Sequence, residues 1–181
     1  MPKQLLTVEG TQVAVVNRDG EDYISLTDMV RENENGASVI DNWLRNKNTL
    51  EFLSVWETMY NPTFNSLEFE GIKSEAGLNR FAISIKQWIA KTNATGLTAK
   101  AGRYGGTFAH RDIAFEFASW ISPKFKLYRI VVLSNLESIN AELIRQALTQ
   151  AERLRALNAT AIAQLRSLVS SKVIKKLKKN D

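Results

Sequence analysis

The sequence of 181 residues contains no cysteine and only one histidine. The absence of cysteine excludes disulfide bonds, thiolate nucleophiles and cysteine-ligated zinc, and a single histidine makes any other zinc site improbable. There is also no uninterrupted apolar run of about 18 residues, so we expect neither a transmembrane helix nor a membrane partner. The N-terminal Met1–Gln4 lacks the basic and then apolar pattern of a secretory signal. We therefore expect a cytoplasmic protein.

Motifs for catalysis are scarce as well. No P-loop, dinucleotide-binding fingerprint or Ser/His/Asp arrangement is present. Asp112 and Glu116 lie one helical turn apart and could hold Mg²⁺ in a nuclease. Carboxylates beside Arg111 at the start of a helix are more simply explained by the favourable electrostatics of that position. We expect a protein that is not an enzyme and that uses no cofactor, metal or small-molecule substrate.

Charge is distributed unevenly along the chain, whose formal net charge is +5. Residues 1–70 carry 12 acidic and five basic side chains, whereas residues 71–181 carry seven acidic and 19 basic ones. Between residues 73 and 111 there are seven basic side chains against one acid, Glu75. A basic face beside an acidic one suits a polyanion that approaches from one side, and DNA or RNA is the first candidate.

The N-terminal half predicts strands followed by short helices. Residues 4–9 and 12–17 are rich in β-formers and separated by Gly10-Thr11, which predicts a hairpin, and 22–26 predicts a third strand. A short helix should follow and end near residue 36. Ser38 is expected to cap a helix that buries Val39, Ile40, Trp43 and Leu44. Thr49 should open a helix with Phe52, Leu53, Trp56 and Tyr60 inward, and residues 68–76 should form another. All four tryptophans are expected in the core.

The segment from Ile83 to Asn93 carries the sharpest local signal. Ser84 and Gln87 form a capping box, and Ile83 and Trp88 occupy the two positions of a hydrophobic staple. Both motifs predict a helix that begins at Ile85. Its apolar face is Ile85, Trp88, Ile89 and Thr92, so that the outward residues are Lys86, Gln87, Ala90, Lys91 and Asn93.

A basic stretch with glycines follows this helix. Residues 97–101 and 107–109 are short extended pieces around Gly102-Arg103-Tyr104-Gly105-Gly106, which predicts a β-hairpin. A helix, a basic hairpin and then a helix at residues 111–120 is the order of a winged helix-turn-helix domain. Lysine and arginine can bind phosphates, Gln87 and Asn93 can read adenine, and glycine lets the backbone approach phosphates. The DNA-binding candidates are Lys86, Gln87, Lys91, Asn93, Lys100, Arg103, Tyr104, Gly105, Gly106, Thr107, His110 and Arg111.

The C-terminal part predicts a long amphipathic helix. Ser122 and Pro123 should start a helix with Phe125, Tyr128 and Val132 inward. Residues 135–179 contain neither proline nor glycine and carry a Leu/Ala stripe, with a lysine-rich end from residue 172. We expect one long helix, broken at most near Asn158. Because a small domain can hardly cover this stripe, residues 137–170 are predicted to form a homodimer. The alternative is that the helix folds back on the domain.

Residues 23–136 resemble the KilA-N domain, a DNA-binding module of bacterial, phage and large DNA-virus proteins. The matching stretches are Ile24–Met29, Asp41–Thr49, Glu68–Ile72, Glu75–Asn79, Trp88–Gly96 and, most densely, residues from Gly102 to Tyr128. The resemblance implies an α+β, winged-helix-like fold similar to the APSES domain of fungal cell-cycle transcription factors. It also implies that residues 85–93 are the recognition helix and residues 100–107 the wing, without catalysis.

Two functions follow as hypotheses. The first is a non-catalytic regulator of phage, prophage or mobile-element type, with residues 1–136 as a domain that binds double-stranded DNA and 137–181 as a helical tail. The alternative is an antirepressor-like adaptor whose basic face binds an acidic protein.

Overall fold

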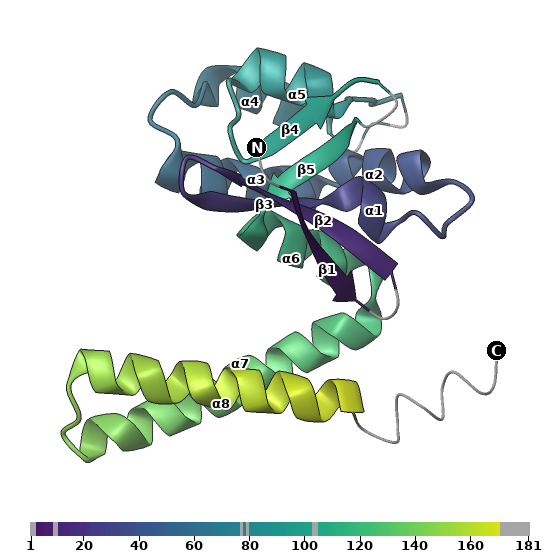
Figure 1. Ribbon diagram of the computed structural model, residues 1–181. Coiled ribbons are helices and arrows are strands. Elements are labelled where there is room, and N and C mark those ends of the chain that lie inside the picture. Colours follow the sequence, from purple (N-terminus) through teal and green to yellow (C-terminus); the bar gives the residue numbers. More distant parts are fainter. Residues whose placement is uncertain (1–2, 9–10, 77, 79, 103–104, 171–181) are drawn as a thin grey trace. The chain divides into compact units, whose positions relative to one another are not determined.

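The computed structural model describes residues 3–8, 11–76, 78, 80–102 and 105–170 (Figure 1). The chain forms two compact units, Met1–Ile121 and Ser122–Asp181. The first unit ends where Ser122 caps a new helix that has Pro123 in its first turn. The domain boundary expected at residue 136 stays a prediction. Among the described residues, no helix combines the length and the apolar character needed to cross a membrane.

The first unit contains an antiparallel sheet with the strand order β1-β2-β3-β5-β4. The fold is thus α+β, as predicted. The two N-terminal strands pair with each other in antiparallel register, and β5 lies between β3 and β4 (Figure 1). The strands are β1 (Lys3–Val8), β2 (Thr11–Arg18), β3 (Glu21–Ser25), β4 (Leu97–Lys100) and β5 (Gly106–His110).

Alternation along β5 divides the core between the two faces of the sheet, because successive side chains of a strand point to opposite sides. Ala109 belongs to the large cluster formed with the helices, which includes Trp43 and Trp88 at 0% exposure. Phe108 instead packs with Ala14 and Tyr23 in a small cluster. The main core thus lies where the helices cover the sheet.

The helices of the first unit differ from their predicted bounds mainly at the N-termini. Asn46, rather than Thr49, accepts the capping bond that starts the third helix, and Asn65 starts the fourth. Ser38 lies inside the second helix, which begins at Gly36. A turn precedes this helix. In the turn the Asn33 carbonyl accepts a hydrogen bond from the Gly36 N–H, and the Asn33 side chain accepts one from the Asn35 N–H. The bounds are α1 (Leu26–Met29), α2 (Gly36–Arg45), α3 (Lys47–Tyr60), α4 (Ser66–Glu75), α5 (Ile85–Thr92) and α6 (Arg111–Ile121).

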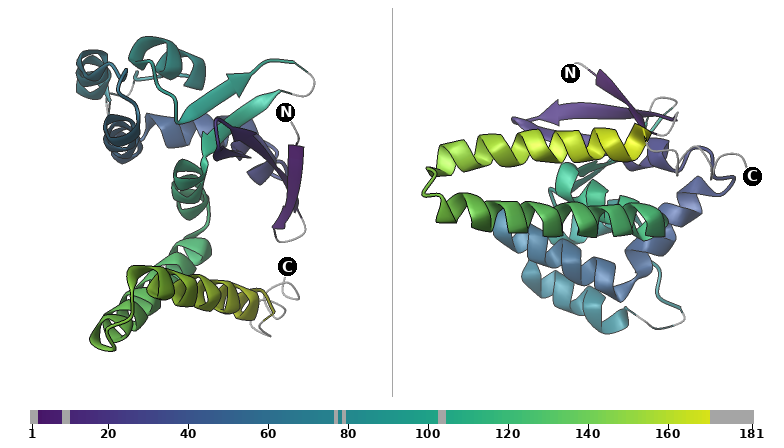
Figure 2. Two further views of the ribbon diagram at one scale, coloured as in Figure 1. Left: turned by 60° about the vertical axis from the view of Figure 1, so that its left-hand side comes forward. Right: turned by 90° about the horizontal axis from the view of Figure 1, so that it is seen from below.

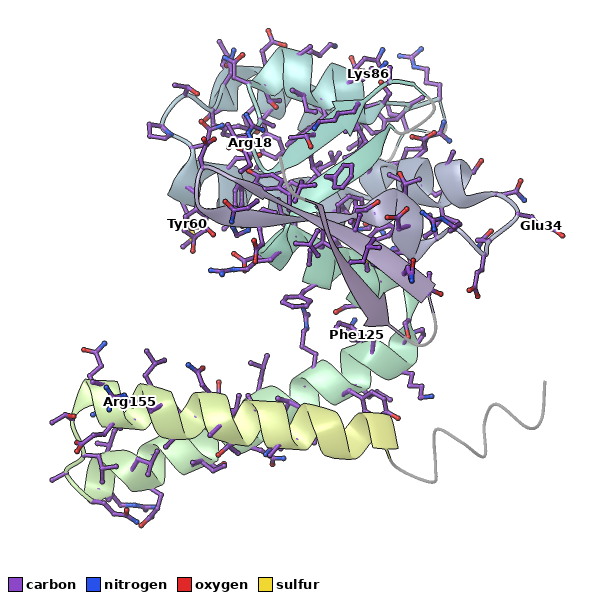
Figure 3. The ribbon with its side chains drawn as sticks, viewed as in Figure 1. Arg18, Glu34, Tyr60, Lys86, Phe125 and Arg155 are labelled. Carbon is purple, nitrogen blue, oxygen red and sulfur yellow. The ribbon has the colours of Figure 1, made fainter. Side chains whose placement is uncertain are left out.

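Two aromatic residues expected in the core lie at the surface. Tyr60 is 59% exposed at the end of α3, where it packs on Trp56 (Figure 3). Trp120 is 40% exposed and stacks on Phe117, with 6.5 Å between the ring centroids. Each is the last apolar residue of its predicted stripe, and the core has already been filled by the residues one turn earlier.

The second unit is a pair of helices, α7 (Pro123–Arg145) and α8 (Gln150–Ser170), and not one long helix (Figure 2). The prediction of a continuous helix, with a break at most near Asn158, was wrong. The break falls at residues 146–149 and has its own signal in the sequence, Thr149 followed by Glu152. The Thr149 backbone N–H donates to the Glu152 carboxylate at 2.9 Å, and the Glu152 N–H donates to the Thr149 hydroxyl at 3.4 Å. This is a capping box that starts α8.

The end of α7 is a Schellman motif built around Ala147. The Leu148 N–H donates to the carbonyl of Leu143 at 3.2 Å, and the Ala147 N–H donates to that of Ile144 at 2.9 Å. Ala147 has φ = 58°, a left-handed conformation in which the Cβ of alanine is unfavourable. This motif reverses the chain without proline or glycine, which explains why the composition of the segment did not reveal it.

We expect Ala147→Gly to stabilise the second unit by about 0.5–1 kcal/mol, because glycine adopts this conformation without a steric cost. Thermal unfolding of the full chain, followed by helical circular dichroism, measures the change. Ala141→Gly, inside α7, is the matched control and should destabilise the helix by about 1 kcal/mol. Equal losses for both variants would contradict the Schellman motif.

Candidate nucleic-acid interface

The start of α5 is fixed by the capping box that the sequence predicted. The Gln87 N–H donates to the Ser84 hydroxyl at 3.3 Å, and the Gln87 side-chain oxygen accepts from the Ser84 N–H at 2.9 Å. Trp88 is fully buried and packs against Phe64 and Phe69. Burial of Trp88 and Ile85 orients the helix, so the opposite side faces solvent.

The C-terminal end of α5 is held by side chains and backbone from the segment that follows α3. The Asn65 N–H donates to the Thr92 carbonyl at 2.8 Å, and the Asn61 side chain donates to the Asn93 carbonyl at 2.8 Å. Asn93 itself has φ = 54° and closes the helix in the left-handed conformation, which asparagine tolerates. These bonds satisfy carbonyls that a helix end leaves free.

A buried carboxylate fixes the turn between α5 and β4. Glu57 of α3 has 0% exposure, and its oxygens accept from the backbone N–H groups of Thr95 (3.0 Å) and Gly96 (2.8 Å) and from the Asn61 side chain (2.8 Å). Hydrogen bonds to a charged acceptor are the stronger kind, and several are needed to offset the desolvation of a carboxylate. Glu57 thereby sets the angle at which the chain leaves α5 and enters β4.

The same turn is bound to the sheet. The Tyr23 hydroxyl donates to the Thr95 carbonyl at 2.9 Å, and the backbone N–H of His110 donates to the Gly96 carbonyl at 2.8 Å. Burial raises the pKa of Tyr23 above its usual value, which favours the protonated hydroxyl that donates this bond. Gly96 has no room for a side chain, because a Cβ would collide with Ile113 and Trp56. The turn is therefore locked between helix, sheet and core.

Strands β4 and β5 pair from Leu97–Ala109 to Lys100–Gly106. The loop between them requires glycine at position 105, since a Cβ there would collide with the carbonyl oxygen of Lys100. The Gly105 N–H donates to the Gly102 carbonyl at 2.9 Å. The predicted contacts of Arg103 and Tyr104 lie outside the described residues.

The lysines predicted to bind DNA are exposed. Lys86 and Lys91 stand on the outer side of α5, and Lys100 lies at the end of β4 (Figure 3 labels Lys86). In the part of the chain that the structure describes, none of the three forms an ion pair. Arg111 differs, because it lies 3.8 Å from both Glu21 and Asp112. Three cations without carboxylate partners are thus available to an external anion.

Lys91 has a less favourable setting than Lys86. It lines a shallow groove between α4 and α5 together with Glu68 and Glu75. Carboxylates on this side oppose the approach of phosphates. A polyanion is therefore expected to meet α5 on the side of Lys86 rather than along the α4 groove.

Several polar residues predicted to touch DNA have structural roles. Reading adenine would require both the oxygen and the nitrogen of the Gln87 side-chain amide. The oxygen already accepts hydrogen bonds from Ser84. The Thr107 N–H donates to the Thr27 hydroxyl at 2.9 Å. The Asn93 side-chain amide lies 3.5 Å from the Thr63 carbonyl.

His110 is 6% exposed rather than at the surface. Its Nε2 lies 3.3 Å from the carboxylate of Glu21, and its Nδ1 lies 3.3 Å from both the N–H and the carboxylate of Asp112. The ring also packs against Tyr23 and Trp56. His110 thus supports the sheet, and the interface proposed below does not include it. Sequence reasoning missed Glu57 altogether, since an isolated glutamate on a helix carries no local signal of burial.

Asp112, a candidate metal ligand in the nuclease hypothesis, accepts a bond from the Trp56 indole at 3.3 Å. Among the described residues, no group of three or more His, Asp or Glu side chains is placed to hold a metal ion.

We expect Glu57→Gln to lower the free energy of unfolding by about 2–4 kcal/mol, because the amide nitrogen would face the N–H donors of Thr95 or Gly96. Urea unfolding of the full chain gives this value. Glu51→Gln on the same helix is the matched control, since Glu51 is half-exposed and its ion pair with Lys73 (3.5 Å) should contribute less than about 1 kcal/mol. A loss at Glu57 no larger than that at Glu51 would contradict the role of the buried carboxylate.

A family model for the KilA-N domain matches residues 7–138, most of the first unit and the first part of α7. Searches of curated proteins and of solved structures found no match. KilA-N domains generally bind DNA, and the family match agrees with the α+β fold and with the exposed lysines. The chain belongs to the KilA-N domain family.

Proposed function

We propose that the protein binds duplex DNA with α5 directed into the major groove and the β4–β5 hairpin beside it as a wing. The observation that carries this proposal is the pair Lys86 and Lys100, both exposed and without ion pairs among the described residues. They stand on the two elements that Glu57 joins through the turn at residues 95–96. A rigid link between a helix and a hairpin lets both meet one DNA segment together.

The groups available at this surface favour contacts to the DNA backbone. Lysine side chains neutralise phosphates, and the loop at Gly105 brings the main chain to the surface without a Cβ. On α5 the exposed Ala90 lies between Lys86 and Lys91 in sequence and leaves room for the helix to approach the bases closely. We further propose a regulatory role in a phage, prophage or other mobile element, for which the family supplies the support.

The salt dependence of binding tests the interface. We expect Lys86→Ala and Lys100→Ala each to weaken binding and to reduce the slope of log K against log salt by about 0.9, the value for one phosphate contact. Lys91→Ala should have a smaller effect because of Glu68 and Glu75. Fluorescence anisotropy with a labelled duplex at several salt concentrations measures both quantities.

Lys73→Ala is the matched control in that experiment. Lys73 lies on α4 in the same basic half of the chain, but it faces α3, where it pairs with Glu51. It should leave the slope unchanged. If the wild-type chain binds no duplex at low salt, the proposal fails. The antirepressor-like adaptor, whose basic face binds an acidic protein, then becomes the better explanation.

The wing can be tested separately through its glycine. Gly105→Ala forces the loop to move away from Lys100, and we expect DNA affinity to fall by about three- to tenfold through lost phosphate contacts. Gly71→Ala is the control, because a Cβ there meets nothing within 4 Å. In helix α4 it should stabilise the protein by about 0.5–1 kcal/mol and leave binding unchanged. Unchanged affinity in Gly105→Ala would remove the hairpin from the interface.

A further inference from the structure

Helix α7 has two apolar faces, and only one of them is covered within the second unit. Helix α7 packs against α8, and its first apolar face consists of partly buried residues at helical spacing, as expected of the side that faces α8. They are Phe125, Tyr128, Val132, Leu136, Ile139 and Leu143. This seam includes Leu143, one of the residues from which the sequence predicted a dimer through residues 137–170.

The opposite face of α7 is apolar in its N-terminal half and small in its C-terminal half. Leu127, Ile130 and Val131 are 63%, 52% and 54% exposed. Ser134 and Ser138 continue the same stripe at the following turns, seven residues after Leu127 and Val131 respectively. The face thus carries large branched side chains in its N-terminal half and small serine side chains in its C-terminal half.

We propose that this face of α7 binds the same face of a second copy in an antiparallel, two-fold symmetric dimer centred near residue 132. In an isologous interface, residue i of the first copy contacts residue j of the second, and residue j of the first copy contacts residue i of the second. Each contact therefore occurs twice. Antiparallel pairing about this centre sets Leu127 against Ser138 of the second copy, and Val131 against Ser134. Large side chains then meet small ones, as close packing requires.

The flanking residues pair about a centre one residue away from that of the core pairs. In antiparallel helix pairs, residues on one flank meet residues on the same flank of the other helix. Ile130 and Leu133 share one flank, and both are half exposed, at 52% each. Lys126 and Glu137 lie on that same flank, are exposed, and have no ion pair among the described residues. The Ile130–Leu133 and Lys126–Glu137 pairs share a centre at residue 131.5, one residue from the centre at 132.5 of the Leu127–Ser138 and Val131–Ser134 pairs. The flanking partners are therefore offset by about 3 Å along the helix axes. Lysine and glutamate side chains are long enough to span this offset and form ion pairs across the dimer.

The proposal goes beyond DNA binding and does not depend on it, because every residue involved lies in the second unit. A dimer would carry two copies of the DNA-binding unit, which predicts a two-fold symmetric operator for a regulator of this kind.

Charge reversal tests the register on the full chain without DNA. We expect Lys126→Glu and Glu137→Lys each to raise the dimer Kd at least about tenfold, since two like-charged pairs then face each other in the dimer. An equimolar mixture of these two variants should form a heterodimer, because both pairs are again of opposite charge. The double variant Lys126→Glu/Glu137→Lys should regain dimerisation to within about threefold. Light scattering over a range of concentrations measures the masses, and circular dichroism verifies the helices.

A second pair of variants tests the apolar part of the face. Val131→Asp should give a monomer, whereas Leu154→Asp, at an equally exposed site on α8 (58%), should remain a dimer. A monomeric wild type would overturn the proposal. So would single reversals that dimerise as well as the wild type, or a mixture that stays monomeric like its two components.

Discussion

The arrangement of the first unit depends on the carboxylate of Glu57. It lies at 0% exposure on α3 and accepts backbone bonds from Thr95 and Gly96, the two residues that join α5 to β4. A buried charge is stable only when donors surround it, and here the Asn61 side chain completes the set. Since α5 and the β4–β5 hairpin meet at this turn, their relative orientation is fixed by a residue that belongs to neither.

Much of the fold could be predicted because its signals are local. The capping box at Ser84, the position of Trp88 on the inner side of α5 and the strands at both ends of the first unit are encoded within a few residues. Glu57 could not be found this way, because its partners lie 38 and 39 residues away in the sequence. The burial of His110 has the same origin, since Glu21 approaches it from 89 residues away.

The error in the second unit has a different physical cause. Its signal was local, a capping box formed by Thr149 and Glu152, but the regular Leu/Ala stripe and the absence of glycine and proline favoured one continuous helix. The chain reverses through Ala147 in a left-handed conformation. Reversal turns part of the stripe into the seam between α7 and α8. The apolar face proposed to bind a partner is on α7 near residue 130, while Ile144 and Leu154 are also exposed in the predicted segment 137–170, which stays a prediction.

Polar residues that look available in the sequence are largely engaged in the structure. Gln87 closes the cap of α5, the Thr107 N–H bonds Thr27, and His110 supports the sheet. Among the described residues of this surface, the groups without an ion pair or hydrogen bond include Lys86 and Lys100. Cations without a matching amide edge bind phosphates rather than distinguish bases. The proposed surface therefore supplies affinity and register more than base selection. Two such surfaces carried by one dimer would contribute specificity that a single surface lacks, so the proposed dimer face of α7 bears on DNA recognition as well.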